Sequence, residues 1–197
     1  MANFQEALDR TLKHEGGYGD IPDDKGGETY RGISRRWYPD WPGWLIIDDL
    51  KSSHSEATFK AALSRSEALA LSVPEFYEQE YWQPLHCEEI ESQAVANELY
   101  DTAVNMSKKW ATRFMQRALN SLNKNQAFYP DIKVDGKIGA TTLRTLKDCL
   151  SVNGEILVVK IMDSLQAARY VNLMDKDPTQ EVFARGWLTH RINIGKV

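Results

Sequence analysis

Residues 14–34 have the sequence HEGGYGDIPDDKGGETYRGIS, in which glycine, proline and aspartate replace the apolar pattern that precedes them. That earlier pattern has apolar residues at helical spacing, namely Phe4, Ala7, Leu8 and Leu12. Asn3, with Glu6 three residues later, resembles the capping box that begins a helix. Gly16 and Gly17 should end this helix, as C-terminal glycines do, and the following residues should form a loop or a short hairpin.

Most of the other periodic segments also predict helix. They are residues 92–104, 110–122, 140–150 and 153–174. Residues 66–81 have a helical pattern as well, although Pro74 should kink that helix or begin a new one. Signals for β structure are confined to short stretches of the glycine-rich region. The expected fold class is therefore mainly α, with a short glycine-rich loop or hairpin after the first helix.

The 197-residue chain has the composition of a globular protein, with 42% hydrophobic and 26% charged residues. No run approaches the roughly 18 consecutive apolar residues of a membrane helix. Charges recur every few positions in residues 1–13, so we expect no Sec signal peptide. Cys87 and Cys149 have neither metal-site spacing nor the pattern of a disulfide framework, and both are expected to be free thiols.

The net charge of −4 hides an asymmetry between the two halves of the chain. Residues 1–100 carry nine Lys and Arg against 19 Asp and Glu, a net charge of −10. Residues 101–197 carry 15 against nine, a net charge of +6. The split favours two functional halves, although chance clustering of surface charge would give the same counts. A pI near 5.6 argues against a dedicated nucleic-acid-binding protein.

Glu15 is the candidate for acid catalysis. On a helical wheel it falls about 20° from Phe4 and from Leu8, so it continues the apolar face of the first helix. A carboxylate there lies at the negative end of the helix dipole and beside packed apolar groups, and both effects favour its protonated form. These are the conditions of a general acid at neutral pH. The structural alternative is a partly buried Glu15 paired with Arg31 or Arg35.

Two residues of the following loop are candidates for secondary catalytic roles. Hydrolysis of a glycosidic bond needs an acid that protonates the leaving oxygen, and a second polar group that steers water or stabilises the oxocarbenium-like state. Asp24 lies nine residues after Glu15, and Thr29 lies five residues further on. A glutamate at a helix end, then a glycine-rich loop with several carboxylates and a threonine, is also the layout of phage-type lysozymes.

Residues 14–34 resemble the N-terminal signature of glycoside hydrolase family 108, the predicted N-acetylmuramidases that are sometimes labelled secretion activators. The second half of the chain resembles the peptidoglycan-binding domain usually attached to this signature. The motifs are LYDTAVN at 99–105, MQRALN at 115–120, VDGKIG at 134–139 and FARGWL at 183–188. The resemblance implies a lysozyme-like, two-lobed helical fold, with a hydrolase domain over residues 1–93 and a helical peptidoglycan-binding domain over residues 94–197.

The same resemblance implies roles for individual residues. Glu15 matches the catalytic glutamate of the family, and Asp24 and Thr29 fall in the matching loop. The candidates for substrate binding are Tyr18, Tyr30 and Asn105. The amide of Asn105 either contacts the N-acetyl group of the substrate or caps the C-terminus of a helix.

The sequence departs from the family pattern at three positions of the loop. Ile21 stands where an acidic residue is common, Lys25 where proline is common, and Glu28 where a small residue is common. The apolar residue at position 21 weakens any mechanism that requires a carboxylate there.

No metal or cofactor is expected, because His54, His86 and His190 have no partner at metal-ligand spacing. The three tryptophans of residues 37–44 have two interpretations. They form a platform on which sugar rings stack, or they staple a loop to the core.

The sequence therefore predicts a peptidoglycan hydrolase that cleaves the bond between N-acetylmuramic acid and N-acetylglucosamine, with Glu15 as general acid. The alternatives are a lytic transglycosylase and a non-catalytic cell-wall-binding or secretion-associated protein. The expected partner is the glycan strand of peptidoglycan, with no nucleic acid and no membrane insertion, and the expected state is a monomer. Without a signal peptide, the chain should be cytoplasmic as synthesised and reach the wall by export or by holin-type release.

Overall fold

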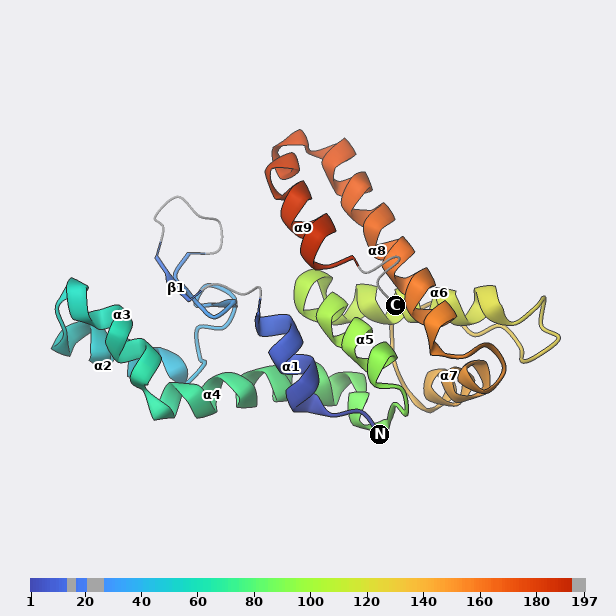
Figure 1. Cartoon of the computed structure of the whole chain (residues 1–197), viewed down its shortest axis with the longest axis horizontal. Helices are drawn as coiled ribbons and strands as arrows, with labels where there is room; N and C mark the ends of the chain where they lie inside the picture. The colour runs from blue at the N-terminus through green and yellow to red at the C-terminus, as the bar shows by residue number, and fades with distance from the viewer. Residues whose placement is uncertain (14–16, 21–26, 193–197) are drawn as a thin grey trace. The chain divides into compact units, whose positions relative to one another are not determined.

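The computed structural model describes residues 1–13, 17–20 and 27–192, and it is mainly helical, as the sequence predicts (Figure 1). Its α-helices are α1 (Phe4–Leu12), α2 (Gly43–Ser53), α3 (Glu56–Arg65), α4 (Glu67–Tyr77), α5 (Gln93–Met106), α6 (Lys108–Leu122), α7 (Ala140–Asn153), α8 (Glu155–Lys176) and α9 (Ala184–His190). The chain divides into two compact units, Leu8–Glu80 and Met1–Ala7 with Tyr81–Val197. Among the described helices, none combines the length and apolar character that a bilayer-spanning helix requires.

A small antiparallel sheet follows the first helix, which confirms the hairpin predicted for the glycine-rich region. Its strands are β1 (Tyr18–Gly19), β2 (Thr29–Tyr30) and β3 (Ile33–Ser34), in the order β1-β2-β3. Tyr18 pairs with Tyr30, and Tyr30 pairs with Ile33. The turn between β2 and β3 consists of Arg31 and Gly32, both with positive φ (46° and 82°), as a tight primed hairpin turn requires.

Helix α1 begins as predicted but ends earlier. The Asn3 side chain accepts a hydrogen bond from the Glu6 backbone N–H at 3.0 Å, which makes Asn3 the N-cap. The box is not reciprocal, because the Asn3 N–H donates to Gln93 Oε1 at 2.6 Å. The helix ends at Leu12 instead of continuing to the two glycines. The wheel angle assigned to Glu15 therefore does not follow from α1, and Glu15 itself lies outside the described residues.

The unit of residues 8–80 has an aromatic core. Trp41 and Trp44 are buried and pack edge to face, with ring centroids 5.1 Å apart, while Trp41 also stacks on Tyr30 at 6.3 Å. These two tryptophans therefore staple the loop before α2 to the core. Trp37 differs from them, because 69% of it is exposed. Gly43 lets α2 begin beneath the Trp41 ring, since a Cβ at this position would meet that ring at 2.3 Å.

Helix α4 continues through Pro74 to Tyr77, so no new helix begins at the proline. Pro74 removes one backbone donor from the helix, but Val73, Phe76 and Tyr77 around it are buried and hold this face against the core. The irregular part follows instead, as the π-helical segment η1 (Glu78–Trp82) and two 3-10 turns, η2 (Gln83–Leu85) and η3 (Cys87–Glu89).

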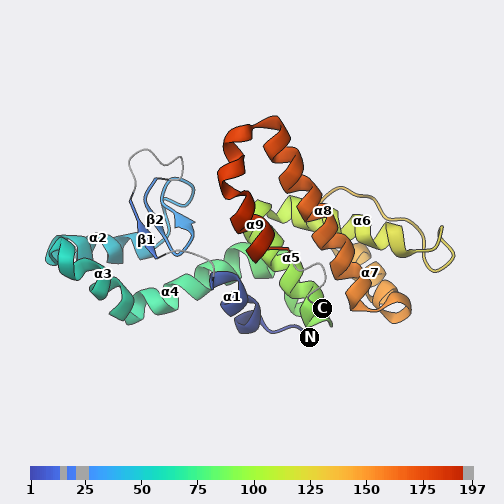
Figure 2. The same cartoon turned by 45° about the horizontal axis from the view of Figure 1, so that its top comes forward.

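The second unit is built on α5, α6 and α8, which pack against one another, and α7 packs on α6 and α8 (Figure 2). The Ser92 side chain caps α5 by accepting from the Val95 N–H at 3.1 Å. Gly154, with φ of 72°, separates α7 from α8, so the break lies slightly later than the one predicted between residues 150 and 153. A 3-10 turn, η4 (Pro178–Phe183), joins α8 to α9. Cys87 and Cys149 are buried free thiols, which confirms that prediction.

Candidate functional site

Two adjoining hollows lie on the unit of residues 8–80, and Tyr18 and Lys60 line both. The larger has a volume of about 650 Å³ and is lined by Tyr18, Gly19, Asp20, Lys51, His54, Glu56, Phe59 and Lys60. The smaller has a volume of about 320 Å³ and is lined by Gly17, Tyr18, Tyr30, Arg31, Lys60, Leu63 and Ser64. Volumes of this size suit small organic ligands. The hollows are therefore the candidate site of this unit.

Tyr18 stands at the wall shared by the hollows. Its ring packs edge to face on Phe59 at 5.0 Å, and its hydroxyl donates to Glu28 Oε1 at 2.6 Å. Lys51 Nζ donates to the same hydroxyl oxygen at 3.0 Å. Burial, and then the hydrogen bond to Glu28, raise the pKa of Tyr18 to about 12, although Lys51 opposes them. Tyr18 is therefore a neutral, oriented phenol at physiological pH.

Glu28 connects Tyr18 to a cluster of charged side chains. Its carboxylate, 14% exposed, forms an ion pair with Arg35, whose Nε lies 2.6 Å from Glu28 Oε2. The other guanidinium nitrogens of Arg35 donate to both carboxylate oxygens of Asp48, at 3.1 and 2.6 Å. This two-fold hydrogen bond lowers the pKa of Asp48. Arg35 thus forms ion pairs with both Glu28 and Asp48. Its alternative predicted pairing with Glu15 stays a prediction.

Lys51, which lines the larger hollow, completes the cluster. Its ammonium lies 3.0 Å from Asp20 and 3.6 Å from Glu28. Hydrogen bonds to Tyr18 and Asp20 raise the pKa of Lys51. Asp20 and Glu28, which flank the predicted catalytic Asp24 in the sequence, are thereby both tied to Lys51. Asp24 itself, like Glu15, lies outside the described residues.

Thr29 and Tyr30 lie in β2, beside the hollows. Thr29 pairs with Gly19, and its hydroxyl oxygen lies 3.2 Å from where a Cβ of Gly19 would be. Tyr30 lines the smaller hollow, but only 5% of it is exposed, and its hydroxyl donates to the Leu63 carbonyl at 3.4 Å. Neither a catalytic role for Thr29 nor a substrate contact by Tyr30 is tested by these positions.

Asn105 lies in the other unit, near the end of α5. The C-cap of that helix is Ser107, so the interpretation of Asn105 as the cap was wrong. The Asn105 side-chain oxygen accepts a hydrogen bond from the Tyr170 hydroxyl of α8 at 2.6 Å. Because Tyr170 occupies the oxygen, the orientation of the Asn105 amide is fixed by the packing of α5 on α8.

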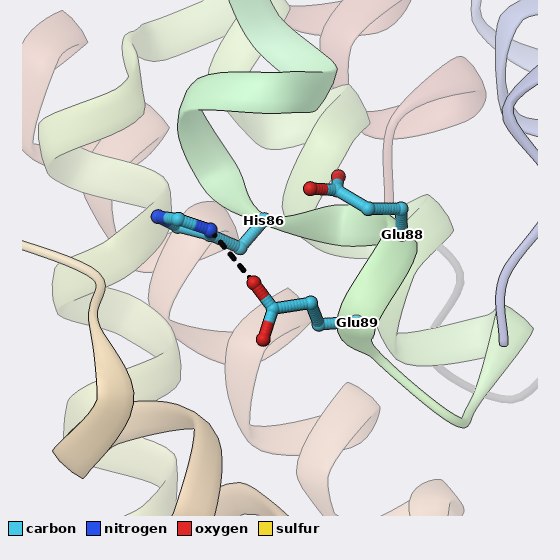
Figure 3. A group of neighbouring side chains, drawn as sticks. All are labelled: His86, Glu88 and Glu89. Carbon is cyan, nitrogen blue, oxygen red and sulfur yellow. Dashed lines mark hydrogen bonds and ion pairs between the residues drawn. The ribbon is translucent and has the colours of Figure 1, made fainter.

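His86 has acidic neighbours, which corrects the statement that it lacks a partner at metal-ligand spacing. Ligand atoms of His86, Glu88 and Glu89 lie within 4.8 Å of one another (Figure 3). The left-handed backbone of His86, with φ of 50°, turns η2 into η3 and brings the three together. His86 Nδ1 lies 2.9 Å from Glu89 Oε1, so a hydrogen bond between these two side chains explains the group. Both glutamates are exposed, and we assign no metal site to them.

The roles of Lys51 and Asp48 were not predicted from the sequence, and Glu28 was interpreted only as a departure from the family pattern. Lys51 lies 33 residues after Tyr18, and Asp48 lies 13 residues after Arg35. No local pattern links such distant residues. A helix with two aspartates and a lysine, such as α2, usually presents these charges to solvent.

The unit that carries the hollows is mainly helical with a small sheet, and comparisons with known families identify the class of protein. The family model "Glycosyl hydrolase 108" matches residues 8–107, more than half of the chain, and the chain belongs to this family. The model "Predicted Peptidoglycan domain" matches residues 110–192, so the chain carries this domain at its C-terminal side.

One similar solved structure is that of Brucella abortus SagA. The match has a TM-score of 0.59 and 21% sequence identity, and it covers 94% of this chain and 87% of the Brucella chain. At this identity the likeness shows a shared fold. The comparison with curated proteins found no match.

Proposed function

We propose that this chain is a peptidoglycan hydrolase that cleaves the bond between N-acetylmuramic acid and N-acetylglucosamine, with Glu15 as general acid. The observation that carries the proposal is the match of residues 8–107 to glycosyl hydrolase 108, because this range contains Glu15 and every residue that lines the two hollows. The peptidoglycan-domain match over residues 110–192 supports peptidoglycan as the substrate.

The chemistry of the hollows supports a sugar ligand. Tyr18 and Phe59 offer aromatic surface, and Asp20, Lys51 and Lys60 offer polar groups to hydroxyls and amides. Gly17, which lines the smaller hollow, comes two residues after Glu15 in the sequence.

In the proposed reaction, Glu15 donates its proton to the leaving glycosidic oxygen as the bond between this oxygen and the anomeric carbon breaks. A water molecule adds to that carbon and releases one proton to solvent, and Glu15 takes up a proton again before the next turnover. Asp24 and Thr29 are the proposed groups that steer this water or stabilise the oxocarbenium-like state. Tyr18 and Tyr30 are the proposed sugar contacts in this unit. Asn105 is a further proposed contact through its amide N–H groups, because Tyr170 already occupies its oxygen.

The proposed partner in the cell is the glycan strand, and the proposed working state is a monomer. The protein would act on the cell wall after export or after release through a holin-type pore. Membrane insertion and nucleic-acid binding form no part of the proposal.

Replacement of Glu15 by glutamine tests the acid. The amide has nearly the same shape but cannot donate a proton as an acid, so clearing of cell-wall suspensions should fall at least 100-fold, while folding is kept. Glu67→Gln is the matched control, because Glu67 is exposed at the first turn of α4 and lines neither hollow. Activity of Glu15→Gln within tenfold of the parent, about 1.4 kcal/mol in the barrier, would contradict the assignment.

Analysis of the products separates the proposal from its two alternatives. A hydrolase releases muropeptides with reducing ends, because water adds to the anomeric carbon. A lytic transglycosylase releases anhydro-muropeptides, because a hydroxyl of the sugar closes a ring instead. A protein that only binds the wall releases neither.

A further inference from the structure

Helix α3 presents one stripe of side chains to both hollows. Phe59 and Lys60 line the larger hollow, and Lys60, Leu63 and Ser64 line the smaller one. Residues three and four positions apart lie on one face of a helix, so these four side chains form a continuous wall. The two hollows are therefore neighbouring parts of one surface, and a ligand that fills one can extend into the other.

The two hollows differ in charge. Asp20 and Glu56 bring carboxylates to the larger hollow. In the part of the chain that the structure describes, no acidic residue lines the smaller hollow, and its charged side chains are Arg31 and Lys60. The Tyr18 phenol beside them is neutral, because its pKa is raised to about 12. The smaller hollow is thus cationic, whereas the larger one carries charges of both signs.

The charges of Arg31 and Lys60 are not compensated by neighbouring carboxylates. Among the described residues, neither side chain takes part in an ion pair or a side-chain hydrogen bond. Lys60 lies one helical turn after Glu56, yet these two described residues form no ion pair. Lys51, by contrast, is held by Asp20 at 3.0 Å. The smaller hollow therefore offers a ligand two cations whose donors are unused.

The backbone of Arg31 is held from two sides. Its N–H donates to the Gly17 carbonyl at 3.0 Å, and its carbonyl accepts from the Tyr77 hydroxyl at 2.8 Å. Its φ of 46° lies in the left-handed region, in the tight turn between β2 and β3. Only the side chain of Arg31 therefore has to be ordered when a ligand binds, and this limits the entropic cost of binding.

The charge of the smaller hollow favours an anion. An anion that enters the hollow is attracted by both cations that line it. The planar guanidinium of Arg31 matches both oxygens of a carboxylate, and the ammonium of Lys60 adds a point charge. Because the larger hollow continues from the smaller one and is a proposed sugar site, the anion should be attached to a sugar ring. In the glycan of peptidoglycan, N-acetylmuramic acid carries such a group on its lactyl arm, and N-acetylglucosamine has no such arm.

We propose that Arg31 and Lys60 form a subsite for a carboxylate on the lactyl arm of N-acetylmuramic acid, and that they distinguish this sugar from N-acetylglucosamine. The proposal rests on the proposed function, which assigns the glycan strand to the hollows. The carboxylate is either that of the lactyl group itself or one on the stem peptide attached to it. In both cases the arm enters the smaller hollow, because Asp20 and Glu56 disfavour an anion in the larger one.

Calorimetric titration with defined tetrasaccharides tests the subsite. Every full-length preparation carries Glu15→Gln, so that turnover does not consume the ligand. An alternating tetrasaccharide of N-acetylglucosamine and N-acetylmuramic acid with free lactyl carboxylates is compared with its lactyl methyl amide, which lacks the charge. A third form carries a stem pentapeptide on each lactyl group. At least one of the two acidic forms should bind about tenfold more tightly than the neutral amide, and the form that does so identifies the carboxylate.

Substitution of either cation should reduce this preference. Lys60→Met and Arg31→Gln should each lower the ratio of the acid affinity to the amide affinity about threefold, and the double variant should bring the ratio near 1. The ratio is the readout, because partial loss of folding lowers both affinities alike. Lys160→Met and Arg65→Gln are the matched controls, because both residues are exposed and line neither hollow. These two variants should keep the ratio of the parent.

The subsite would be overturned if neither acidic form bound more tightly than the amide, or if the test variants and the control variants changed the ratio equally. Displacement of the acidic ligand by an equal concentration of inorganic phosphate would also overturn it, since the hollow would then be a general anion site. Wall hydrolysis by the chain with Glu15 intact keeps the two proposals apart. A carboxylate preference without hydrolysis contradicts the proposed function alone, and hydrolysis without the preference contradicts this subsite alone.

Discussion

At the scale of single residues, Tyr18 is held by charges of both signs. Its hydroxyl donates to Glu28 and accepts from Lys51, and its pKa is raised to about 12 from an ordinary value of 10.0. A raised pKa means that the folded state favours the neutral, protonated phenol of Tyr18. The neutral phenol therefore contributes to the stability of the fold below pH 10. This contribution is lost as the pH rises through 12. The Tyr18 hydrogen bonds are therefore fully formed across the physiological range.

Substitutions of the two partners should move the pKa of Tyr18 in opposite directions. Glu28→Gln removes the negative charge that opposes the phenolate, so the pKa should fall toward 10. Lys51→Met removes the cation that favours the phenolate, so the pKa should rise further. The ¹³Cζ chemical shift of Tyr18, assigned with Tyr18→Phe, follows the titration. An unchanged pKa in both variants would show that burial alone sets it.

Gly136 has a structural role that follows from its backbone conformation. Replacement by alanine forces a Cβ into a left-handed conformation and within 2.9 Å of the Lys109 carbonyl. We expect a loss of about 2 kcal/mol in the free energy of unfolding, measured by urea denaturation.

The control for this substitution is Gly186→Ala in α9. A Cβ there meets nothing within 4 Å, and the helical backbone should gain roughly 0.5–1 kcal/mol. If both substitutions changed stability by the same amount and sign, the close approach of Gly136 to α6 would have no energetic weight.

At the scale of elements, Ser92 sets the start of α5. Its side chain accepts from the Val95 N–H and also contacts the Glu155 carboxylate at the start of α8. Ser92→Ala leaves the helix terminus unsatisfied, and we expect a loss of about 1 kcal/mol in unfolding free energy. Ser55→Ala is the matched control, because Ser55 occupies the N-cap of α3 without a side-chain capping bond. An equal loss from both substitutions would contradict a capping role for Ser92.

Elements with strong local signals could be predicted from the sequence. Ser92 marks the start of α5, where the predicted helix also begins, and the hairpin follows from a glycine-rich segment with Gly32 in its turn. The end of α1 at Leu12 and the passage of α4 through Pro74 could not be predicted. Both depend on which faces are buried, and burial is decided by residues far away in the sequence.

Some residues of the candidate site could likewise be predicted from the sequence, and others could not. Tyr18, Thr29 and Tyr30 were named from a local motif, and they do line or border the hollows. The role of Lys51 depends on the contact of α2 with Tyr18 of β1, which lies 33 residues earlier in the chain. Contacts of this kind leave no trace in the spacing of a single sequence.

At the scale of the whole molecule, the matched families and the packing divide the chain at different places. The family models meet between residues 107 and 110, whereas the packing divides the chain after Glu80 and adds Met1–Ala7 to the second unit. The reason is an aromatic cluster: Phe4 lies 5.6 Å from Trp82 and 6.2 Å from Tyr100. The boundary predicted between residues 93 and 94 stays a prediction.

Expression of fragments tests this boundary. A cut between residues 93 and 94 separates Tyr100 from Phe4 and Trp82, and it also removes the Ser92 cap from α5. Loss of packing around a buried aromatic residue costs about 3–5 kcal/mol, and a whole domain is stable by only about 5–15 kcal/mol. We therefore expect fragments 1–93 and 94–197 to lack cooperative thermal unfolding by near-ultraviolet circular dichroism.

Fragment 81–197 is the matched comparison, because it keeps Trp82 and Ser92 and loses only Phe4 from the cluster. It should unfold cooperatively, at a lower temperature than the parent chain. Addition of a peptide of residues 1–12 should raise that temperature, because Phe4 would again cover Trp82 and Tyr100 and a ligand of the folded state stabilises it. Cooperative unfolding of fragment 94–197 at the temperature of fragment 81–197 would instead favour the boundary at residue 93, since residues 81–93 would then add nothing to the stability of α5.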